Sequence, residues 1–168
     1  MVTYAFYNSP FGLLKTGTAG GKVILITTVT TQDERHQPTS LSNEVYAQLQ
    51  AYFAGRRTEF SLPYELIGTT LQKQVWAQIA QIPYGKTAAY KDIAESIGKP
   101  CAFQATGRAV GANPLPIIIP CHRVIGSNGT LTGYALGLEM KKALLKLEQG
   151  LAIPTFSSKP IPCFPTTG

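Results

Sequence analysis

The segment Pro116-Ile117-Ile118-Ile119-Pro120-Cys121-His122-Arg123-Val124 determines how the rest of the chain is interpreted. Its apolar, β-branched run at 117–119 predicts a buried strand. Pro120 has no backbone N–H for a sheet ladder, so the expected strand ends or bends there. A thiol, an imidazole and a guanidinium follow at once. We therefore expect a nucleophile at the edge of a core.

A known family carries a similar signature. The pentapeptide 120–124, preceded by Asn113-Pro114-Leu115-Pro116, resembles that of the O6-alkylguanine-DNA alkyltransferases, and the segment 75–90 is similar to the same family. The resemblance implies DNA repair by transfer of an alkyl group from guanine O6 (and thymine O4) irreversibly to the protein's own cysteine, after base flipping. It also implies that double-stranded DNA containing O6-alkylguanine is the partner, that the protein acts as a monomer, and that no cofactor is needed.

Cysteine and histidine usage favours an intracellular protein without a metal site. The three cysteines, Cys101, Cys121 and Cys163, form no CxxC pair, which indicates reduced thiols and a cytoplasmic location. Only His36 and His122 could add imidazole ligands, and they lie far apart in sequence. No signal-peptide pattern or membrane-spanning run is present, so we expect no membrane association.

The basic excess is confined to one part of the chain. Residues 1–68 carry as many acidic as basic side chains, so the formal net charge of +6 falls entirely in residues 69–168. A polyanion such as DNA is a plausible partner for that part. A solvated basic surface would give the same count, so charge alone does not decide between the two.

Hydrophobic periodicity and the positions of glycine and proline divide the chain into three parts. They are a structural β/α lobe at 1–68, an alkyltransferase DNA-binding and catalytic domain at 69–150, and a Pro-rich flexible tail at 151–168. We predict strands at 2–7, 11–14 and 22–29, and helices at 43–54, 69–81, 87–97, 101–111 and 139–149. Ser42 is expected to cap the first helix, and Thr69 and Gln72 to form a capping box at the second. The fold class is α/β of the α+β kind, and the resemblance implies a ribonuclease H-like N-terminal lobe.

The helices at 87–97 and 101–111 are separated by Gly98-Lys99-Pro100, which is the pattern of a helix-turn-helix. The second helix is rich in small residues, so its backbone can approach another surface closely. Close packing against another helix would need the same residues. The family resemblance favours DNA, with this helix in the minor groove.

A thiol needs help to act as a nucleophile, because its ordinary pKa of about 8.5 leaves it mostly protonated at neutral pH. Cys121 alone would more often be a small buried hydrophobe, but its place between Pro120 and His122 favours a nucleophile–base pair. The resemblance implies that Glu148 orients His122, that a water bridges the base to the thiol, and that Asn113 hydrogen-bonds the turn around Cys121. Arg123 could equally be a structural ion-pair partner.

The resemblance also implies a base pocket and a DNA surface. Tyr90 would push the nucleotide out, backbone groups of Cys121 and Val124 would bind the exocyclic amine, and Tyr134 and Ala135 would close over the base. Keeping the segment from Tyr90 to Cys121 free of gaps puts Gln104 where the family usually has an arginine finger, with Arg108 one turn later. The full expected sets are Tyr90, Pro116, Val124, Tyr134 and Ala135 for the pocket, and Tyr90, Lys91, Lys99, Gln104, Arg108 and Ser127 for DNA.

The last helix has an amphipathic pattern. It is predicted to bury Met140, Leu144 and Leu147 and to expose Lys141, Lys142 and Lys146. Just before it, Leu136 occupies a position where the family often has glycine, which would narrow the pocket against bulky adducts.

Three other functions fit part of the pattern. A non-enzymatic alkyl-lesion binder of the alkyltransferase-like group typically replaces the motif cysteine, and Cys121 argues against it. A helix-turn-helix regulator would bind duplex DNA without preferring alkylated guanine. A Cys–His hydrolase would need an acyl-substrate cleft, for which the sequence gives no sign.

Overall fold

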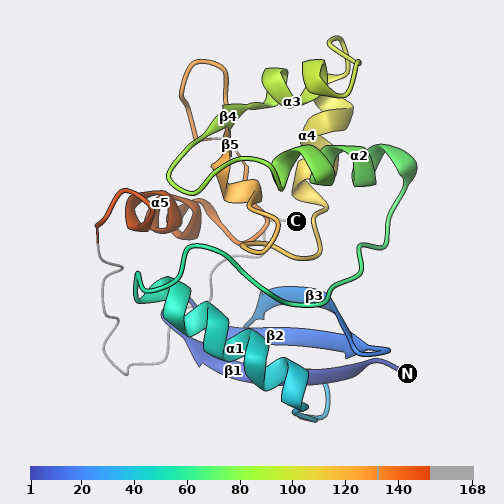
Figure 1. Ribbon diagram of the computed structural model, residues 1–168, viewed down its shortest axis with the longest axis vertical. Helices are drawn as coiled ribbons and strands as arrows, with labels where there is room; N and C mark the ends of the chain where they lie inside the picture. The colour runs from blue at the N-terminus through green and yellow to red at the C-terminus, as the bar shows by residue number, and fades with distance from the viewer. Residues whose placement is uncertain (132, 152–168) are drawn as a thin grey trace.

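The computed structural model describes residues 1–131 and 133–151, and the tail predicted at 151–168 lies outside them except for its first residue. An N-terminal lobe contains an antiparallel sheet in the order β1-β2-β3, made of β1 (Thr3–Ser9), β2 (Gly12–Ala19) and β3 (Lys22–Val29). Helix α1 (Ser40–Phe53) packs beside this sheet (Figure 1). The strand predicted at 22–29 is confirmed, whereas the second strand runs five residues beyond its predicted end.

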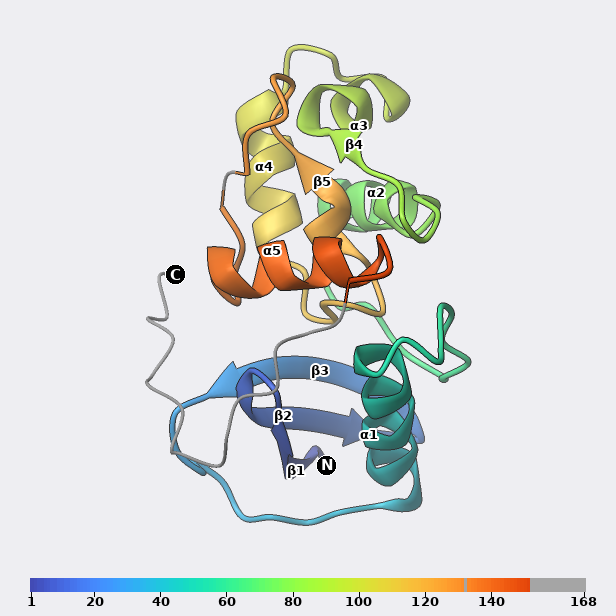
Figure 2. The same cartoon turned by 90° about the vertical axis from the view of Figure 1, so that its left-hand side faces the viewer.

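A mostly helical region follows, so the fold is α+β. It contains α2 (Thr70–Ile79), α3 (Tyr90–Ser96), α4 (Phe103–Gly111) and α5 (Leu138–Leu147). A short parallel pair joins β4 (Ala88–Ala89) to β5 (Val124–Ile125). Figure 2 shows α5 lying across the boundary between these helices and the N-terminal lobe.

The first two helices each begin directly after a threonine that caps them. Thr69 and Gln72 form the predicted reciprocal capping box of α2. At α1 the prediction was wrong by one turn: Thr39 is the N-cap, and Ser42 is the residue three positions later that returns the hydrogen bond. The helix predicted from residue 87 begins at Tyr90, because residues 88–89 are extended and pair with β5.

The buried strand predicted at 117–119 is wrong. This apolar run is a tight turn in which Ile119 N–H donates to Leu115 O at 2.9 Å, and Ile117 has a φ of 75°. Asn113 closes the turn from inside: its Nδ2 donates to Ile119 O at 2.7 Å, and its Oδ1 accepts from Leu115 N at 3.0 Å. Burial was predicted correctly, since Ile117 and Ile119 are buried, but side-chain hydrogen bonds replace a sheet ladder.

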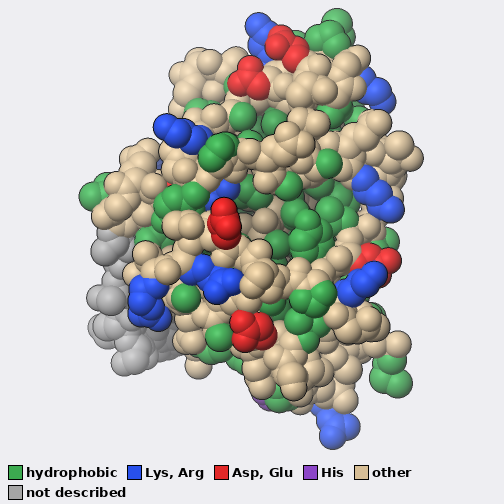
Figure 3. All heavy atoms as spheres, viewed as in Figure 1, with side chains coloured by type: hydrophobic (Ala, Val, Ile, Leu, Met, Phe, Trp, Pro, Cys, Tyr) green, Lys and Arg blue, Asp and Glu red, His purple; other side chains and the backbone are tan. Residues whose placement is uncertain are grey.

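One apolar core runs through both parts of the chain. It joins N-terminal residues such as Leu14 and Ile26 to C-terminal residues such as Leu115 and Trp76. On the face seen in Figure 3, hydrophobic side chains gather between the levels of α2 and β3. Among the described residues, no helix combines the length and apolar character needed to cross a bilayer.

Candidate active site

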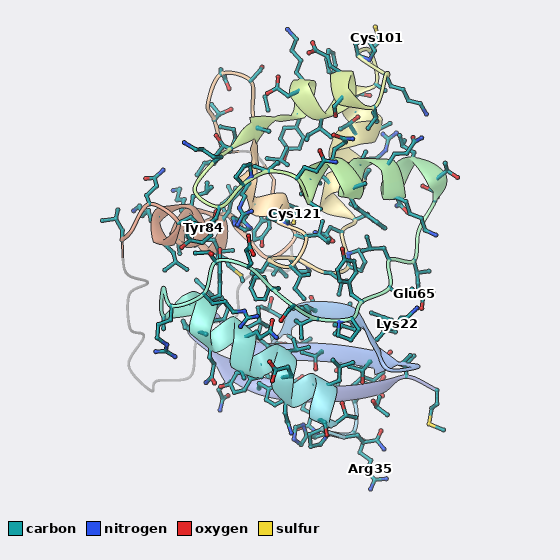
Figure 4. The ribbon with its side chains drawn as sticks, viewed as in Figure 1. Lys22, Arg35, Glu65, Tyr84, Cys101 and Cys121 are labelled. Carbon is teal, nitrogen blue, oxygen red and sulfur yellow. The ribbon has the colours of Figure 1, made fainter. Side chains whose placement is uncertain are left out.

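Cys121 opens a single turn of 3₁₀ helix, η1 (Cys121–Arg123), directly after the buried Ile turn. Its side chain is buried, whereas Cys101 is exposed at the tip between α3 and α4 (Figure 4). Burial raises the pKa of the Cys121 thiol to about 11, although a hydrogen bond with Asn113 and the charge of Lys141 act in the opposite direction. At neutral pH the resting thiol is therefore protonated.

The thiol faces a pocket of about 400 Å³. The pocket walls come from α3, α4 and the loop before α5, and consist of Tyr90, Gly107, Val110, Gly111, Cys121, Gly133, Tyr134 and Ala135. An added Cβ at Gly107 or Gly111 would meet no atom within 4 Å, so there is open space beside both glycines, which line the pocket on the α4 side. A planar heterocycle has room to reach the thiol here.

The carboxylate of Glu148 receives donors on both oxygens. Its Oε2 accepts from His122 Nε2 at 2.6 Å and from Arg123 Nη2 at 3.0 Å, while Oε1 accepts from Arg123 Nε at 2.7 Å and from Gly85 N at 3.2 Å. Burial by itself raises the pKa of Glu148, but the donors from His122 and Arg123 outweigh it and lower the pKa to about 2. Glu148 is thus an anion at neutral pH, fixed at the C-terminal end of α5 by partners that outweigh an unfavourable helix dipole.

The ionised carboxylate determines the tautomer of His122. An anionic Glu148 can only accept, so Nε2 of the imidazole carries the hydrogen. Complete burial lowers the pKa of His122, against the opposing effect of Glu148, and keeps the ring neutral. Nδ1 is then a lone-pair acceptor, and it has no partner among the described residues. A neutral imidazole with a free acceptor nitrogen is the form that can take a proton.

Arg123 completes the buried ion pair, in line with the structural alternative raised from the sequence. Besides Glu148, its Nη1 donates to Ile82 O at 2.7 Å, and its guanidinium lies 5.6 Å from the centre of the Tyr84 ring. The side chain is 8% exposed. Because Arg123 neutralises Glu148, the carboxylate can be buried without losing its charge.

The outward placement predicted for Lys141 is wrong. The residue is fully buried, and its Nζ donates to Val124 O at 2.7 Å and to Gly133 O at 3.3 Å. Burial lowers its pKa to about 8. The spacing of Lys141, Leu144 and Glu148 places all three on one helix face; that spacing was available in the sequence, but the positive charge suggested solvent. Met140, Leu144 and Leu147 are buried and Lys142 and Lys146 are exposed, as predicted.

Tyr52, from α1, also reaches this site and was missed. Its hydroxyl donates to Glu148 Oε2 at 2.5 Å and lies 3.4 Å from His122 Nε2. The contact joins residues separated by 96 positions in the chain, and no local pattern indicates it. Sequence reasoning could place Tyr52 only on a buried helix face.

The expected pocket residues are distributed unevenly. Tyr90, Tyr134 and Ala135 line the pocket, whereas Pro116 and Val124 are buried but do not line it. Leu136 is also buried and absent from the pocket walls. The Tyr134 hydroxyl, like His122 Nδ1, is a buried polar atom without a partner among the described residues.

The residues expected to contact DNA lie on the exposed side of the same region. Gln104 and Arg108 are exposed one turn apart on α4, Lys99 is exposed in the turn between α3 and α4, and Ser127 is exposed after β5. Lys91 is exposed and lies 3.9 Å from Glu95 in an i,i+4 pair. The parts of the chain at 1–131 and 133–151 contain no cluster of three potential metal-ligating side chains.

Comparisons with known proteins agree with this geometry. Residues 70–150 match the family described as 6-O-methylguanine DNA methyltransferase, DNA binding domain. The methylated-DNA–protein-cysteine methyltransferase of Mycolicibacterium paratuberculosis is 43% identical over 157 residues, which cover 89% of this chain and 93% of that one.

Solved structures extend the comparison to the fold. Mycobacterium tuberculosis OGT in complex with DNA is 41% identical, with a TM-score of 0.82 over 89% of this chain and 94% of that one. The O6-methylguanine-DNA methyltransferase of Pyrococcus kodakaraensis, at 24% identity, shares the fold with a TM-score of 0.66 over 88% of this chain and 99% of that one. By its sequence over nearly its whole length, and by a fold with a buried thiol beside a Glu–His pair, the chain belongs to the methylated-DNA–protein-cysteine methyltransferase family.

Proposed function

We propose that this protein repairs DNA by moving the methyl group of O6-methylguanine, and the alkyl group of O4-alkylthymine, onto Cys121. The observation that carries the proposal is a buried thiol that faces an open pocket next to a neutral imidazole. The Nε2–H of this imidazole is bound to Glu148, and its Nδ1 meets no hydrogen-bond partner within the described parts of the chain. Family membership supplies the lesion class. Asn113, hydrogen-bonded to Cys121 and to the turn before it, holds the nucleophile in place.

The transfer balances without a cofactor. Through a water held between them, Cys121 gives its proton to His122 Nδ1, and the thiolate attacks the methyl carbon. The S–C bond forms as the O6–C bond breaks, and the electron pair stays on the guanine oxygen. The Ala135 N–H donates to that oxygen. The guanine ring takes up one proton from water, and His122 returns the proton that it received from the thiol to water, so the protons balance. The resulting thioether has no route back to a thiol, so each molecule acts once.

Access to the thiol requires the target nucleotide to leave the duplex. In our proposal α3 and α4 act as a helix-turn-helix, with α4 in the minor groove and Tyr90 directing the nucleotide into the pocket. Gln104 fills the gap in the base stack, Arg108, Lys91, Lys99 and Ser127 contact the backbone, and Tyr134 covers the base. The exposure of Gln104 and Arg108 on α4, the helix that also lines the pocket with Gly107 and Gly111, supports the arrangement.

The proposal includes a division of labour along the chain. Residues 69–150 would form the DNA-binding and catalytic domain, acting as a monomer, and residues 1–68 a structural lobe of ribonuclease H-like type. The matched family segment at 70–150 supports the first boundary.

Intact-protein mass after mixing with a duplex that carries one O6-methylguanine tests the proposal. A stoichiometric gain of about 14 Da, mapped to Cys121, is the expected result of irreversible capture by an activated thiolate. Tight lesion binding without a gain would replace transfer by a lesion-binding role. Neither a gain nor a preference for the lesion would leave only a DNA-binding protein.

A further inference from the structure

Tyr52 brings a side chain of the N-terminal lobe into contact with the carboxylate that orients the base. We infer that Tyr52 is a positioning residue for alkyl transfer: its hydroxyl, delivered by α1, fixes Glu148 Oε2 in the orientation that pairs with His122. The Tyr52 hydroxyl and His122 Nε2 donate to this same oxygen, at 2.5 and 2.6 Å. The inference rests on the proposed function, because it concerns the rate of that reaction.

The Tyr52 hydroxyl is the third donor to Glu148 Oε2 and the fifth to the carboxylate as a whole. The other four donors come from His122, from two nitrogens of Arg123 and from Gly85 N, and they already match the roughly four lone-pair sites of an ionised carboxylate. With the hydroxyl removed, Oε2 would keep only His122 and the longer Arg123 bond of 3.0 Å. The carboxylate could then turn toward the guanidinium, which would loosen the imidazole.

Packing alone does not explain a tyrosine at this position. The Tyr52 ring contacts the rings of Phe53, Phe60 and Tyr84 at centroid distances of 5.8, 5.5 and 6.2 Å. A phenylalanine would make the same ring contacts and would avoid burying a hydroxyl, which needs a partner when it is withdrawn from water. The feature that needs a function is therefore the hydroxyl.

A second contact connects the same lobe to the other side of the thiol. Ile26 N–H of β3 donates to Pro114 O at 2.9 Å, directly after Asn113. Asn113 in turn closes the turn that leads into Cys121. The N-terminal lobe thus contacts Pro114, in the turn that leads to Cys121, and Glu148, the hydrogen-bond partner of His122.

The sign of the expected pH effect follows from charge. The Tyr52 donor stabilises the Glu148 anion and withdraws charge from the oxygen that faces His122, so its loss leaves more negative charge on that oxygen and makes His122 easier to protonate. The other titratable and charged groups around the pair stay in place in the variant; they are Tyr84 after α2, Cys121 and Arg123 on η1, Tyr134 before α5, and Lys141 on α5.

The test compares Tyr52→Phe with Tyr46→Phe. Tyr46 lies on the same helix, and its hydroxyl donates to Asn8 O at 2.7 Å within the N-terminal lobe. Methyl transfer from a duplex is timed by mass between pH 5 and 9 for both variants and the wild type, with urea unfolding on the same preparations. We expect Tyr52→Phe to slow transfer about three- to tenfold, because the base is held less well, and to move the acid limb up by roughly half a pH unit or more. Tyr46→Phe should do neither.

A second measurement reads the imidazole directly. The chain has only two histidines, so ¹⁵N-histidine spectra resolve His122 against His36 as an internal reference. Tyr52→Phe should shift the His122 Nε2–H signal and leave His36 unchanged.

A variant that matches the wild type in rate at every pH and in its His122 signal overturns the inference alone. A loss of rate by one constant factor at all pH values, with lowered stability, overturns it in favour of a purely structural role. A wild type that gains no methyl group would instead defeat the proposed function, and this inference with it.

Discussion

The buried centre and the exposed surface of the C-terminal region are built in opposite ways. At the centre, Glu148, His122 and Arg123 are almost inaccessible to water and are joined by hydrogen bonds of 2.6 to 3.0 Å. On α4, Gln104 and Arg108 are exposed. In the proposed function, folding alone fixes the groups that carry the chemistry, whereas the groups that recognise DNA stay free to adapt to a partner. Substitutions should therefore cost far more at the centre than on the surface.

The largest effect should come from Cys121→Ser. A hydroxyl is too weakly acidic to replace the thiol as nucleophile, so transfer should be abolished, while the similar size of serine leaves the pocket open. Intact mass should show no gain, and titration with the lesion-containing duplex should show nearly wild-type affinity. Loss of lesion binding together with transfer would contradict the division between chemistry and recognition.

Lys141→Met should slow transfer about a hundredfold. The substitution removes the donor that joins Val124 O to Gly133 O beside the pocket, together with a positive charge that favours the thiolate of Cys121. Lys142→Met is the matched control, because Lys142 is the exposed neighbour on the same helix. Single-turnover rates on the same duplex give the comparison, and equal rates for the two variants would remove Lys141 from the centre.

Glu148→Gln should reduce stability in a pH-dependent manner. The folded-state pKa of Glu148, about 2, lies below its ordinary value of 4.5, so its stabilisation is complete above pH 4.5 and is lost as pH falls toward 2. The linked free energy is about 3 kcal/mol by the usual 1.4 kcal/mol per pKa unit. Urea unfolding of the wild type and the variant should differ at pH 7 and converge toward pH 3. A constant difference would show that the charge is not the stabilising feature.

Gln104→Ala should have the smallest effect, a three- to fivefold loss of rate on duplex DNA. The side chain is exposed and has no role in holding the thiol, so reaction with free O6-benzylguanine should be unchanged. Arg108→Ala, one turn along the same helix, is the comparison: whichever variant loses more rate on duplex DNA lacks the side chain that fills the gap in the base stack. Equal losses on duplex and free base would exclude Gln104 from base flipping.

The sequence predicted local features well and distant ones poorly. The strand at 22–29 and the capping box at Thr69 follow from neighbours within a few residues. The run at 117–119 was given the wrong conformation because apolar character signals burial, while the Asn113 hydrogen bonds that make it a turn have no periodicity.

At the site, the same limit applies to partners contributed from far along the chain. The motif places Cys121 beside His122, and the family resemblance adds Glu148. Tyr52 reaches the site through tertiary packing alone. The buried Lys141 contradicts the rule that lysines face water, because backbone carbonyls accept hydrogen bonds from its ammonium group.

The protonated, buried state of Cys121 has a consequence for the lifetime of an acceptor that can be used only once. Alkylating compounds and oxidants react with thiolates. Little of Cys121 is present as an accessible thiolate, because the residue is 4% exposed and its pKa is raised to about 11. Cys101, at the surface, meets such reagents first. Each molecule therefore keeps its one reactive thiol until a base enters the pocket. The number of lesions that a cell can repair is then set by the number of folded copies of the protein in that cell.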